Sequence, residues 1–498
     1  MTTTTVHDLV PVALRRQWAA QGHYPDRDLY DLFAVRVFLH PSRTAVIDDD
    51  GELTYSQLNE LALRMAANLR ERGVRPGDVV AVQLPNCRYA VAADLAVAAL
   101  GGVVLPFPVG RGEHEARSLV TRSGAVGVIA DDLPDAWSTV SLVAPADVVE
   151  PVRSDPHGPA RILVSSGSEA EPKMVLYSHN ALLGGRGAFV GRLIPPGEEL
   201  RALFLVPLAS SFGSNGTTVT LARHGGTLVL QSKFSVESTV ELIARARPTH
   251  LFGVPTMFKM LLDQPGDYSS IRVIAPGGAQ LDAATAEACR EVFDAIVVNV
   301  YGSADGVNCH TALDDPPHRG AGRPNPAVAS ILVVDEALRP VPTGVVGEII
   351  ARGPMSPLRY VDDDLNARYR TPDGWVRTGD LGVFDAEGYL SVVGRRKDIV
   401  IRGGANISPA EVEQALAAHP SIRDVACVGV PDELMGERLC ACLVVSAPVT
   451  VEELGEFLGG LSRFKHPEHL LVLPEFPLTP AGKVDRDALR VLARRERR

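Results

Sequence analysis

The sequence predicts an α/β protein with a large N-terminal domain of parallel sheets flanked by helices, a small β-rich subdomain, and a small α+β C-terminal domain. Short apolar runs alternate with helical stretches over roughly the first three hundred residues, which is typical of a parallel sheet covered by helices. From about residue 322 to 393 the pattern changes to short alternating strands with frequent Gly and Pro. The last segment, of roughly one hundred residues, is long enough for a domain.

Size and composition restrict the class of protein. A chain of 498 residues exceeds what one hydrophobic core usually serves, so at least two domains are expected. The net charge of −11 and the lack of basic runs argue against a nucleic-acid or membrane-surface binder. No signal sequence or membrane-spanning apolar stretch is evident, so a soluble, cytoplasmic protein is expected. The six cysteines lack CxxC pairs or histidines at ligand spacing, which favours buried reduced thiols over a zinc site or disulfides.

The first elements follow from hydrophobic patterning. Thr44 to Asp48 and Leu53 to Tyr55 read as two strands joined by a turn at Asp50-Gly51. Ser56 is expected to cap the helix that follows, whose apolar stripe ends at Gly73. The alternation then continues with a helix from Arg88 to Leu100. The strands expected around it are Val79 to Gln83, Val103 to Phe107, Val126 to Ala130 and Ile162 to Val164.

The second half repeats the alternation, and its strands end in small-residue loops. Two of these loops are Pro276-Gly277-Gly278-Ala279 and Tyr301-Gly302-Ser303. Ligands in open parallel sheets bind outside the carboxyl ends of strands, so these loops are candidate binding positions. The strands expected here are Leu203 to Val206, Thr227 to Leu230, His250 to Val254, Arg272 to Ala275 and Ile296 to Val300.

The stretch SSGSEAEPK, from Ser165 to Lys173, predicts an anion-binding loop. Small residues let successive backbone N–H groups face one point, while serine hydroxyls and a lysine add donors and charge. The Walker A spacing is absent, so the stretch does not indicate a P-loop NTPase. No GxSxG motif occurs, so a serine hydrolase has little support.

Further motifs follow this loop in a fixed order: PGGAQL, NVYGSAD, RTGDLG, GRRKDIVIRGGANISPAEVE and TPAGKVDR. As an ordered set they are specific, and over nearly the whole chain the sequence resembles the adenylate-forming superfamily of acyl-CoA and coumarate-type CoA ligases, carrier-loading adenylation domains and luciferases. The resemblance implies that ATP converts a carboxylic acid to an acyl-adenylate, after which a thiol, usually that of CoA, expels AMP. It also implies a mobile C-terminal domain, residues 398–498, that turns relative to residues 1–397 between the two steps.

The resemblance assigns roles position by position. Lys483 matches the lysine that bridges the carboxylate and the α-phosphate, and Asp305 matches the acid that holds Mg²⁺. Asp380 matches the acid that binds the ribose hydroxyls, Arg395 a nucleotide contact, and Asp398 the hinge. The remaining positions match the pyrophosphate loop (Ser165, Ser166, Gly167, Ser168, Lys173), the adenine and phosphate walls (Gly277, Gly278, Ala279, Tyr301, Gly302, Ser303), the CoA channel (Gly403, Gly404) and the acyl pocket (Ser210, Phe212, Gly306).

Departures from the family pattern concentrate at the phosphates. The usual Ser-Gly-Thr-Thr-Gly becomes Ser-Gly-Ser-Glu169-Ala170, and the usual Tyr-Gly-x-Thr-Glu ends in Ala304-Asp305. A carboxylate about 5 Å from a phosphate charge costs roughly 3 kcal/mol at an effective dielectric near 20. These losses affect ATP and spare a ready-made acyl-AMP, so they favour an enzyme with an impaired ATP half-reaction that acts mainly on preformed acyl-AMP and CoA.

Three alternatives remain beside that interpretation: a complete ATP-dependent acid–CoA ligase, a carrier-protein-loading adenylation enzyme, and an inactive homologue used as a binding subunit. The expected ligands are a bulky carboxylic acid or its adenylate, CoA, and ATP with Mg²⁺ where adenylation is retained. The small Ala209 and Ser210, where CoA ligases usually carry an aromatic residue and a histidine, favour a roomy acyl pocket. A separate adenylating enzyme is a possible partner under the first interpretation.

Overall fold

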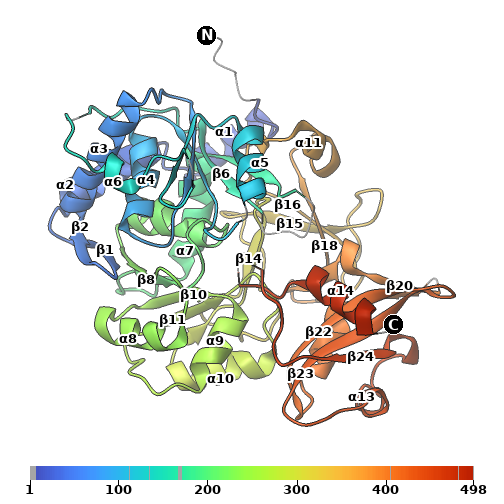
Figure 1. Ribbon diagram of the computed structural model, residues 1–498. Helices are drawn as coiled ribbons and strands as arrows, with labels where there is room; N and C mark the ends of the chain where they lie inside the picture. The colour runs from blue at the N-terminus through green and yellow to red at the C-terminus, as the bar shows by residue number, and fades with distance from the viewer. Residues whose placement is uncertain are drawn as a thin grey trace.

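The computed structural model describes residues 7–111, 113–133, 135–147, 149–165, 171–403, 405–479 and 482–496. Two large sheets, a β-rich subdomain and a C-terminal sheet follow one another along the chain (Figure 1). This is the α/β architecture that the sequence predicts. No helix among the described residues is long and apolar enough to cross a membrane.

The first large sheet has six strands in the order β17-β7-β6-β4-β3-β5. The pairs among β3, β4, β5 and β6 are parallel, but β7 runs antiparallel to β6, and β17 antiparallel to β7. The sheet is therefore mixed at one edge, where β6 and β7 form the hairpin that carries the Ser165–Lys173 loop. The strands are β3 Val79–Gln83, β4 Val103–Pro106, β5 Gly127–Ala130, β6 Pro159–Val164, β7 Met174–Ser178 and β17 Arg359–Tyr360.

The second large sheet has seven strands in the order β12-β11-β10-β8-β9-β1-β2. All pairs are parallel except β1–β2, the hairpin expected at Asp50-Gly51. The run expected as one strand over 296–300 is divided, because the chain leaves this sheet after β12 and begins a new hairpin at Val300. The strands are β1 Thr44–Asp48, β2 Gly51–Thr54, β8 Arg201–Phe204, β9 Thr227–Leu230, β10 His250–Gly253, β11 Val273–Pro276 and β12 Ile296–Val297.

Helices cover both sheets, and the helix after β2 corrects one expectation. Thr54, rather than Ser56, caps α3, because the Thr54 side chain and Gln57 form a reciprocal capping box. The nine residues Val91–Ala99 of α4 are all buried, as an almost wholly apolar helix requires. The helices are α1 Val12–Ala20, α2 Leu29–Leu39, α3 Tyr55–Glu71, α4 Arg88–Ala99, α5 Glu113–Ser123, α6 Thr139–Leu142, η1 Ala181–Arg186, α7 Gly187–Arg192, η2 Gly213–Asn215, η3 Gly216–Arg223, α8 Val236–Ala246, α9 Pro255–Leu262 and α10 Ala283–Phe293.

The β-rich subdomain begins with the hairpin of β13 (Val300–Gly302) and β14 (Asn308–His310). Its main sheet has the antiparallel order β15-β16-β18-β19. The side chains of Val307 and Cys309 share a core with strands β15 and β16. The remaining elements are β15 Ser330–Val334, β16 Gly347–Arg352, α11 Asp363–Tyr369, β18 Val376–Phe384 and β19 Leu390–Arg395.

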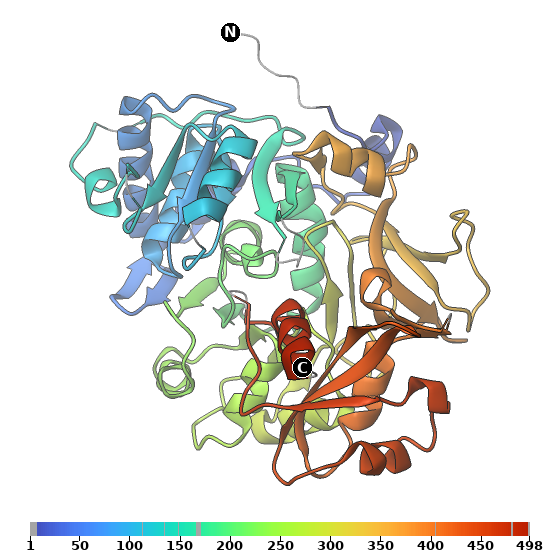
Figure 2. The same ribbon diagram turned by 45° about the vertical axis from the view of Figure 1, so that its right-hand side comes forward.

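The C-terminal segment has its own sheet, ordered β21-β20-β23-β22 with β24 on β23, and hydrophobic clusters of its own. Both views show it beside α9 and α10 (Figures 1 and 2). All six cysteines are free, five of them buried, as expected. The elements are η4 Arg396–Asp398, β20 Val400–Arg402, β21 Ala405–Ile407, α12 Pro409–Leu416, β22 Ile422–Asp432, β23 Gly436–Val445, α13 Val451–Phe457, η5 Arg463–Lys465, β24 His469–Val472 and α14 Arg486–Glu496.

Candidate active site

The anion loop is closed at its base by backbone contacts between β6 and β7. Ser165 N–H donates to the Lys173 carbonyl at 2.9 Å, and Lys173 N–H donates to Ser165 Oγ at 3.0 Å. The Ser165 hydroxyl oxygen therefore accepts a hydrogen bond from within the loop and holds the two ends of the loop together. Four residues of the expected phosphate site, Ser166, Gly167, Ser168 and Glu169, lie outside the described residues.

Lys173 leads from this loop to Asp305. Its Nζ lies 4.0 Å from Asp305 Oδ1 and 3.7 Å from the ring centroid of Tyr369. The Tyr360 hydroxyl donates to Asp305 Oδ1 at 2.7 Å, and Ser303 Oγ donates to Oδ2 at 3.2 Å. Burial and then the Asp305 charge raise the pKa of Tyr360 well above its usual range, so this hydroxyl keeps its proton as a donor. The structure thus brings Lys173, Ser303 and Asp305 together.

Tyr360 and Tyr369 are residues that the sequence reasoning missed. They lie on β17 and α11, and the pairing of β17 with β7 brings them beside Lys173. The only local signal is a pair of tyrosines in an otherwise polar segment, YVDDDLNARY. Such a pair is also common on protein surfaces, so the signal is weak without the long-range strand pairing.

Asp380 is the centre of a second cluster. It lies on β18, is buried, and accepts from the Tyr301 hydroxyl at 2.7 Å and from Arg395 Nε at 2.9 Å. Burial raises the pKa of this carboxyl above its usual value, against the opposing effect of Arg395. The cross-strand register Asp380↔Arg395 between β18 and β19 sets this geometry. The three predicted residues therefore form one hydrogen-bonded unit.

Lys483 reaches this cluster from the C-terminal segment. A Cβ on Gly278 would lie 3.0 Å from Lys483 Cε and 3.3 Å from its Nζ. Gly278 also has a φ of +81°, so the position favours glycine on both grounds. Burial, and next the Arg395 charge, lower the pKa of Lys483 to about 8, with Asp380 opposing them. The lysine is thus held in the site within the field of Asp380 and Arg395.

Gly277 marks where the nucleotide wall meets the expected acyl pocket. It forms a parallel bridge with Val300, and a Cβ there would lie 3.3 Å from both Phe212 Cε1 and Val300 Cβ. Phe212 packs edge-on against Phe252 at 5.8 Å. A Cβ at Gly306, where φ is +98°, would lie 2.5 Å from Pro357 Cδ. Two positions predicted for the acyl pocket, Phe212 and Gly306, therefore lie in tightly packed surroundings.

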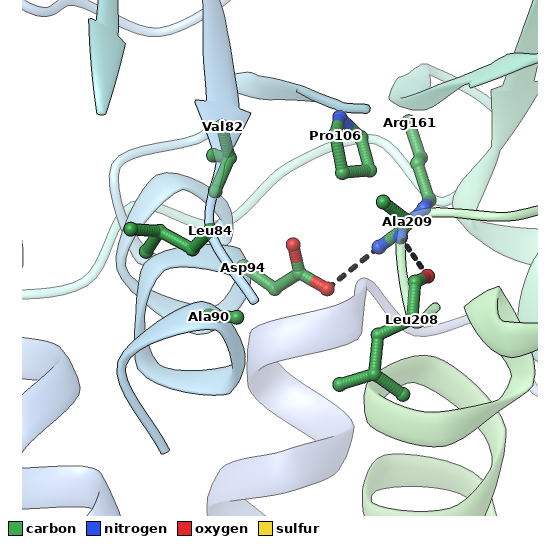
Figure 3. Close-up of a pocket in the computed structure, with 8 residues that line it drawn as sticks. All are labelled: Val82, Leu84, Ala90, Asp94, Pro106, Arg161, Leu208 and Ala209. Carbon is green, nitrogen blue, oxygen red and sulfur yellow. Dashed lines mark hydrogen bonds and ion pairs between the residues drawn. The ribbon is translucent and has the colours of Figure 1, made fainter. Parts of the chain in front are cut away.

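Two small residues of the loop after β8, Ala209 and Ser210, make local contacts. Ser210 Oγ accepts from Gly213 N–H at 3.0 Å and so closes a local turn. Ala209 lines a cavity of about 10 Å³, which has room for roughly one water molecule. Figure 3 shows the reason, since Arg161 extends along this cavity toward Asp94 and Leu208. Ala209 therefore faces a buried ion pair rather than enlarging an acid-binding pocket.

The ion pair between Arg161 and Asp94 also contacts the backbone of the loop after β8. Arg161 Nη1 donates to Asp94 Oδ2 at 2.6 Å, and Nη2 donates to the Leu208 carbonyl at 3.2 Å (Figure 3). Both side chains are almost fully buried, 2% and 6% exposed. A buried charge that lacks its partner is very costly, so the pair fixes the position of the loop that carries Ser210 and Phe212.

The N-terminal and C-terminal parts of the chain also contact each other outside the site. Lys259 on α9 lies with its Nζ 3.3 Å from Asp282 Oδ2 and 3.5 Å from Asp424 Oδ1, and Asp424 belongs to β22 of the C-terminal sheet. Asp398, the expected hinge, accepts from Arg490 Nη2 at 2.7 Å. Gly403 has a φ of +55° and bonds through its N–H to the Met435 carbonyl. Gly404 lies outside the described residues.

Two family models match this chain. The AMP-binding enzyme model covers residues 33–361, and the AMP-binding enzyme C-terminal domain model covers residues 411–483. The 2-hydroxy-7-methoxy-5-methyl-1-naphthoate–CoA ligase of Streptomyces carzinostaticus is 32% identical over 97% of this chain and 96% of its own length. The salicyl-AMP ligase / salicyl-S-ArCP synthetase of Mycobacterium tuberculosis is 30% identical over 96% and 93%.

A solved structure has the same fold over nearly the whole chain. The o-succinylbenzoate CoA synthetase of Bacillus subtilis, in complex with its acyl-adenylate intermediate, superposes with a TM-score of 0.82 and 27% identity. The match covers 93% of this chain and 98% of that one. The likeness thus extends through both the N-terminal sheets and the C-terminal segment that carries Lys483.

Proposed function

Since the chain belongs to the AMP-binding enzyme family and is an acid–thiol ligase of its acyl-CoA synthetase branch, we propose that it activates an aromatic carboxylic acid with ATP and transfers the acyl group to CoA. The observation that carries this proposal is the position of Lys483 against Gly278, beside Asp380 and Arg395. A cation there can neutralise charge on both a substrate carboxylate and an α-phosphate, which is what the first half-reaction requires.

In that first half-reaction, Lys173 and the Ser165–Lys173 loop hold the β- and γ-phosphates. The carboxylate oxygen attacks the α-phosphorus, and pyrophosphate leaves. Asp380 accepts from the ribose hydroxyls, a role that suits an acceptor-only carboxylate. The buried Asp305, oriented by Tyr360 and Ser303, provides the hard oxygen ligand that Mg²⁺ prefers. Mg²⁺, when bound, would offset phosphate charge beside Lys173.

In the second half-reaction, a thiol attacks the carbonyl carbon of the acyl-adenylate and AMP leaves. We assign Asp398 as the hinge about which residues 398–498 turn, which removes Lys483 from the site. Gly403, whose φ of +55° and contact with Met435 leave little room for a side chain, then lies with Gly404 along the pantetheine channel. The two half-reactions thus take place at one site, and the domain rotation occurs between them.

An aromatic acid is the substrate class with the best support. The two curated relatives act, by their names, on a naphthoate and on salicylate. Phe212, which is partly exposed and packs edge-on against the buried Phe252, also lies on this side of the site, and a flat ring packs well on an aromatic side chain. The test is a panel of benzoic, naphthoic and short aliphatic acids, followed by pyrophosphate release with ATP and Mg²⁺. Fastest turnover with acetate would contradict the proposal.

A carrier-protein thiol is the second candidate acceptor, because one relative is named as both a salicyl-AMP ligase and a salicyl-S-ArCP synthetase. The preformed acyl-adenylate is supplied with either CoA or a phosphopantetheinylated aryl-carrier protein, and mass spectrometry identifies the thioester. CoA thioester supports the first acceptor. Acyl-carrier protein without CoA thioester would assign the second.

We further propose that Glu169 makes adenylation the slower half-reaction, and we expect Glu169→Thr to accelerate it. Restoring the hydroxyl that the family carries removes a repulsion of up to about 3 kcal/mol against pyrophosphate, or up to about a hundredfold in rate. ATP–pyrophosphate exchange measures the gain. Thioester formation from preformed acyl-AMP is the internal control, because AMP has no β-phosphate. An exchange rate that stays the same in Glu169→Thr would refute the role of Glu169.

Asp424→Asn is expected to shift the balance between the half-reactions. The Lys259–Asp424 ion pair joins the N-terminal and C-terminal domains in the orientation of this structure. Because both side chains are partly exposed, we expect the ratio of the two half-reaction rates to change by about two- to threefold. The ratio of pyrophosphate exchange to thioester formation from acyl-AMP should fall. Asp267→Asn breaks a surface pair with Arg247 within one domain and serves as the matched control. Equal ratios in both variants would contradict the prediction.

A further inference from the structure

The hairpin of β13 and β14 presents two polar side chains to the acyl side of the site. Its register pairs Val300 with His310, Tyr301 with Cys309 and Gly302 with Asn308. Cys309 packs in the core of the β-rich subdomain, with Tyr301 against it. Because neighbouring residues of a strand point to opposite faces and directly paired residues share one, His310 and Asn308 face the other way, on the side of Val300.

Val300 identifies that face as the one that carries Phe212. A Cβ on Gly277 would lie 3.3 Å from both Val300 Cβ and Phe212 Cε1, so the two side chains converge there. A second aromatic ring, Phe189 of α7, meets the His310 ring at 4.9 Å and 64°. His310 therefore packs against Phe189, and both His310 and Asn308 share the hairpin face of Val300, which converges with Phe212 beside Gly277.

The hydrogen bonding of His310 leaves an acceptor available. His310 Nδ1 lies 3.0 Å from Asn308 Oδ1, which can only accept, so Nδ1 carries the proton. Burial, and next the charge of Arg192, lower the pKa of His310 to about 4, so the ring is neutral at pH 7 and Nε2 has a lone pair. Within the described part of the chain, no hydrogen bond to His310 Nε2 or to the Asn308 amide nitrogen is found beside the bond between Nδ1 and Oδ1.

Both side chains are buried, each 7% exposed. Neither His310 Nε2 nor Asn308 Nδ2 is among the described side-chain atoms that are fully buried without a partner, so each keeps some accessible surface that a ligand can reach. A ligand that covers such a donor or acceptor without bonding to it is disfavoured. Asn308 Nδ2 also lies within 3.5 Å of the position that a Cβ on Gly302 would take, on the floor of the site. One donor and one acceptor thus lie side by side on the hairpin face that carries Val300.

We propose that Asn308 and His310 form a polar subsite of the acyl pocket that selects aromatic acids bearing a ring hydroxyl. The hydroxyl donates to His310 Nε2 and accepts from Asn308 Nδ2. This inference rests on the proposed function, since it assumes that an aromatic acid occupies the pocket. An acid that lacks the hydroxyl would bury both groups unsatisfied and lose roughly tenfold to a hundredfold in kcat/KM.

The test compares kcat/KM, from pyrophosphate release, for benzoate and 1-naphthoate with that for their positional hydroxy isomers. We expect one hydroxy isomer to exceed its parent acid by about tenfold or more. His310→Phe should reduce this preference to less than threefold. His310→Gln places an acceptor amide there and should retain part of the preference.

Cys309→Ala is the matched control, because this side chain lies on the same strand and faces the subdomain core. It should keep the hydroxyl preference unchanged. A wild-type enzyme that turns over parent acids as fast as every hydroxy isomer would overturn the subsite, as would an undiminished preference in His310→Phe. If no aromatic acid releases pyrophosphate at all, the proposed function itself fails, which is a different outcome.

Discussion

Lys483→Ala is expected to reduce ATP–pyrophosphate exchange by about a thousandfold. Removing one preorganised charge or donor at a developing anion typically costs roughly a hundredfold to a thousandfold. Lys483 is at the upper end of this range, because it is buried beside Gly278, where water cannot replace its charge. Exchange is measured with saturating acid and Mg²⁺, and thioester formation from preformed acyl-AMP is measured in parallel.

Thioester formation from preformed acyl-AMP distinguishes a loss of adenylation chemistry from a general loss of folding or domain docking. Thioester formation should change less than threefold, because the proposed rotation of the C-terminal domain removes Lys483 from the site. Lys465→Ala removes another lysine of the same domain, one that pairs with Glu411 at 2.6 Å, and should leave both half-reactions unchanged. Equal losses in both half-reactions of Lys483→Ala would show that the residue acts through folding or docking rather than on the adenylate.

The pH dependence follows from the same lysine. Burial lowers its pKa to about 8, so the ammonium form needed for adenylation is present below pH 8 and is lost as pH rises through that value. The profile of kcat/KM for ATP reports the free enzyme and should fall above about pH 8. The kcat profile should fall at higher pH, because bound phosphate raises the pKa of a neighbouring ammonium group.

Local sequence rules account for most elements and for the motif residues of the site. The helix cap illustrates how such rules are decided: Thr54 and Ser56 are both good caps, but only Thr54 has a Gln three residues later, and the capping box forms there. Asp380 and Arg395 meet because two adjacent antiparallel strands bring them into register. Alternating patterns and ordered motifs therefore carry this part of the structure.

Features that depend on distant contacts could not be derived in this way. Tyr360 reaches Asp305 only because β17 adds to the edge of the first sheet, next to β7. The orientation of the C-terminal domain depends on contacts such as Lys259–Asp424, which join segments more than one hundred and fifty residues apart. Ala209 suggested a roomy pocket, whereas the Arg161 side chain, anchored from another strand, fills the space beside it.

Asp94→Asn is expected to destabilise the N-terminal domain by about 3–5 kcal/mol. The change keeps the shape of the side chain but removes the charge that balances Arg161, and a buried guanidinium then lacks a counter-ion. Arg161 Nε already has no hydrogen-bond partner among the described residues, so the local network has little capacity to compensate. Because a multidomain chain does not unfold in one step, the measurement must report on one domain.

Tryptophan fluorescence meets this requirement, since all three tryptophans, Trp18, Trp137 and Trp375, precede the C-terminal domain. The urea midpoint from fluorescence should fall strongly in Asp94→Asn. Glu60→Gln, which breaks an exposed pair with Arg64, should change the free energy of unfolding by less than about 0.5 kcal/mol. The double variant Asp94→Leu, Arg161→Met should recover much of the loss, because an apolar pair of similar volume needs no counter-ion. A midpoint in Asp94→Asn no lower than that of Glu60→Gln would show that the Asp94–Arg161 pair does not hold the loop after β8 in place.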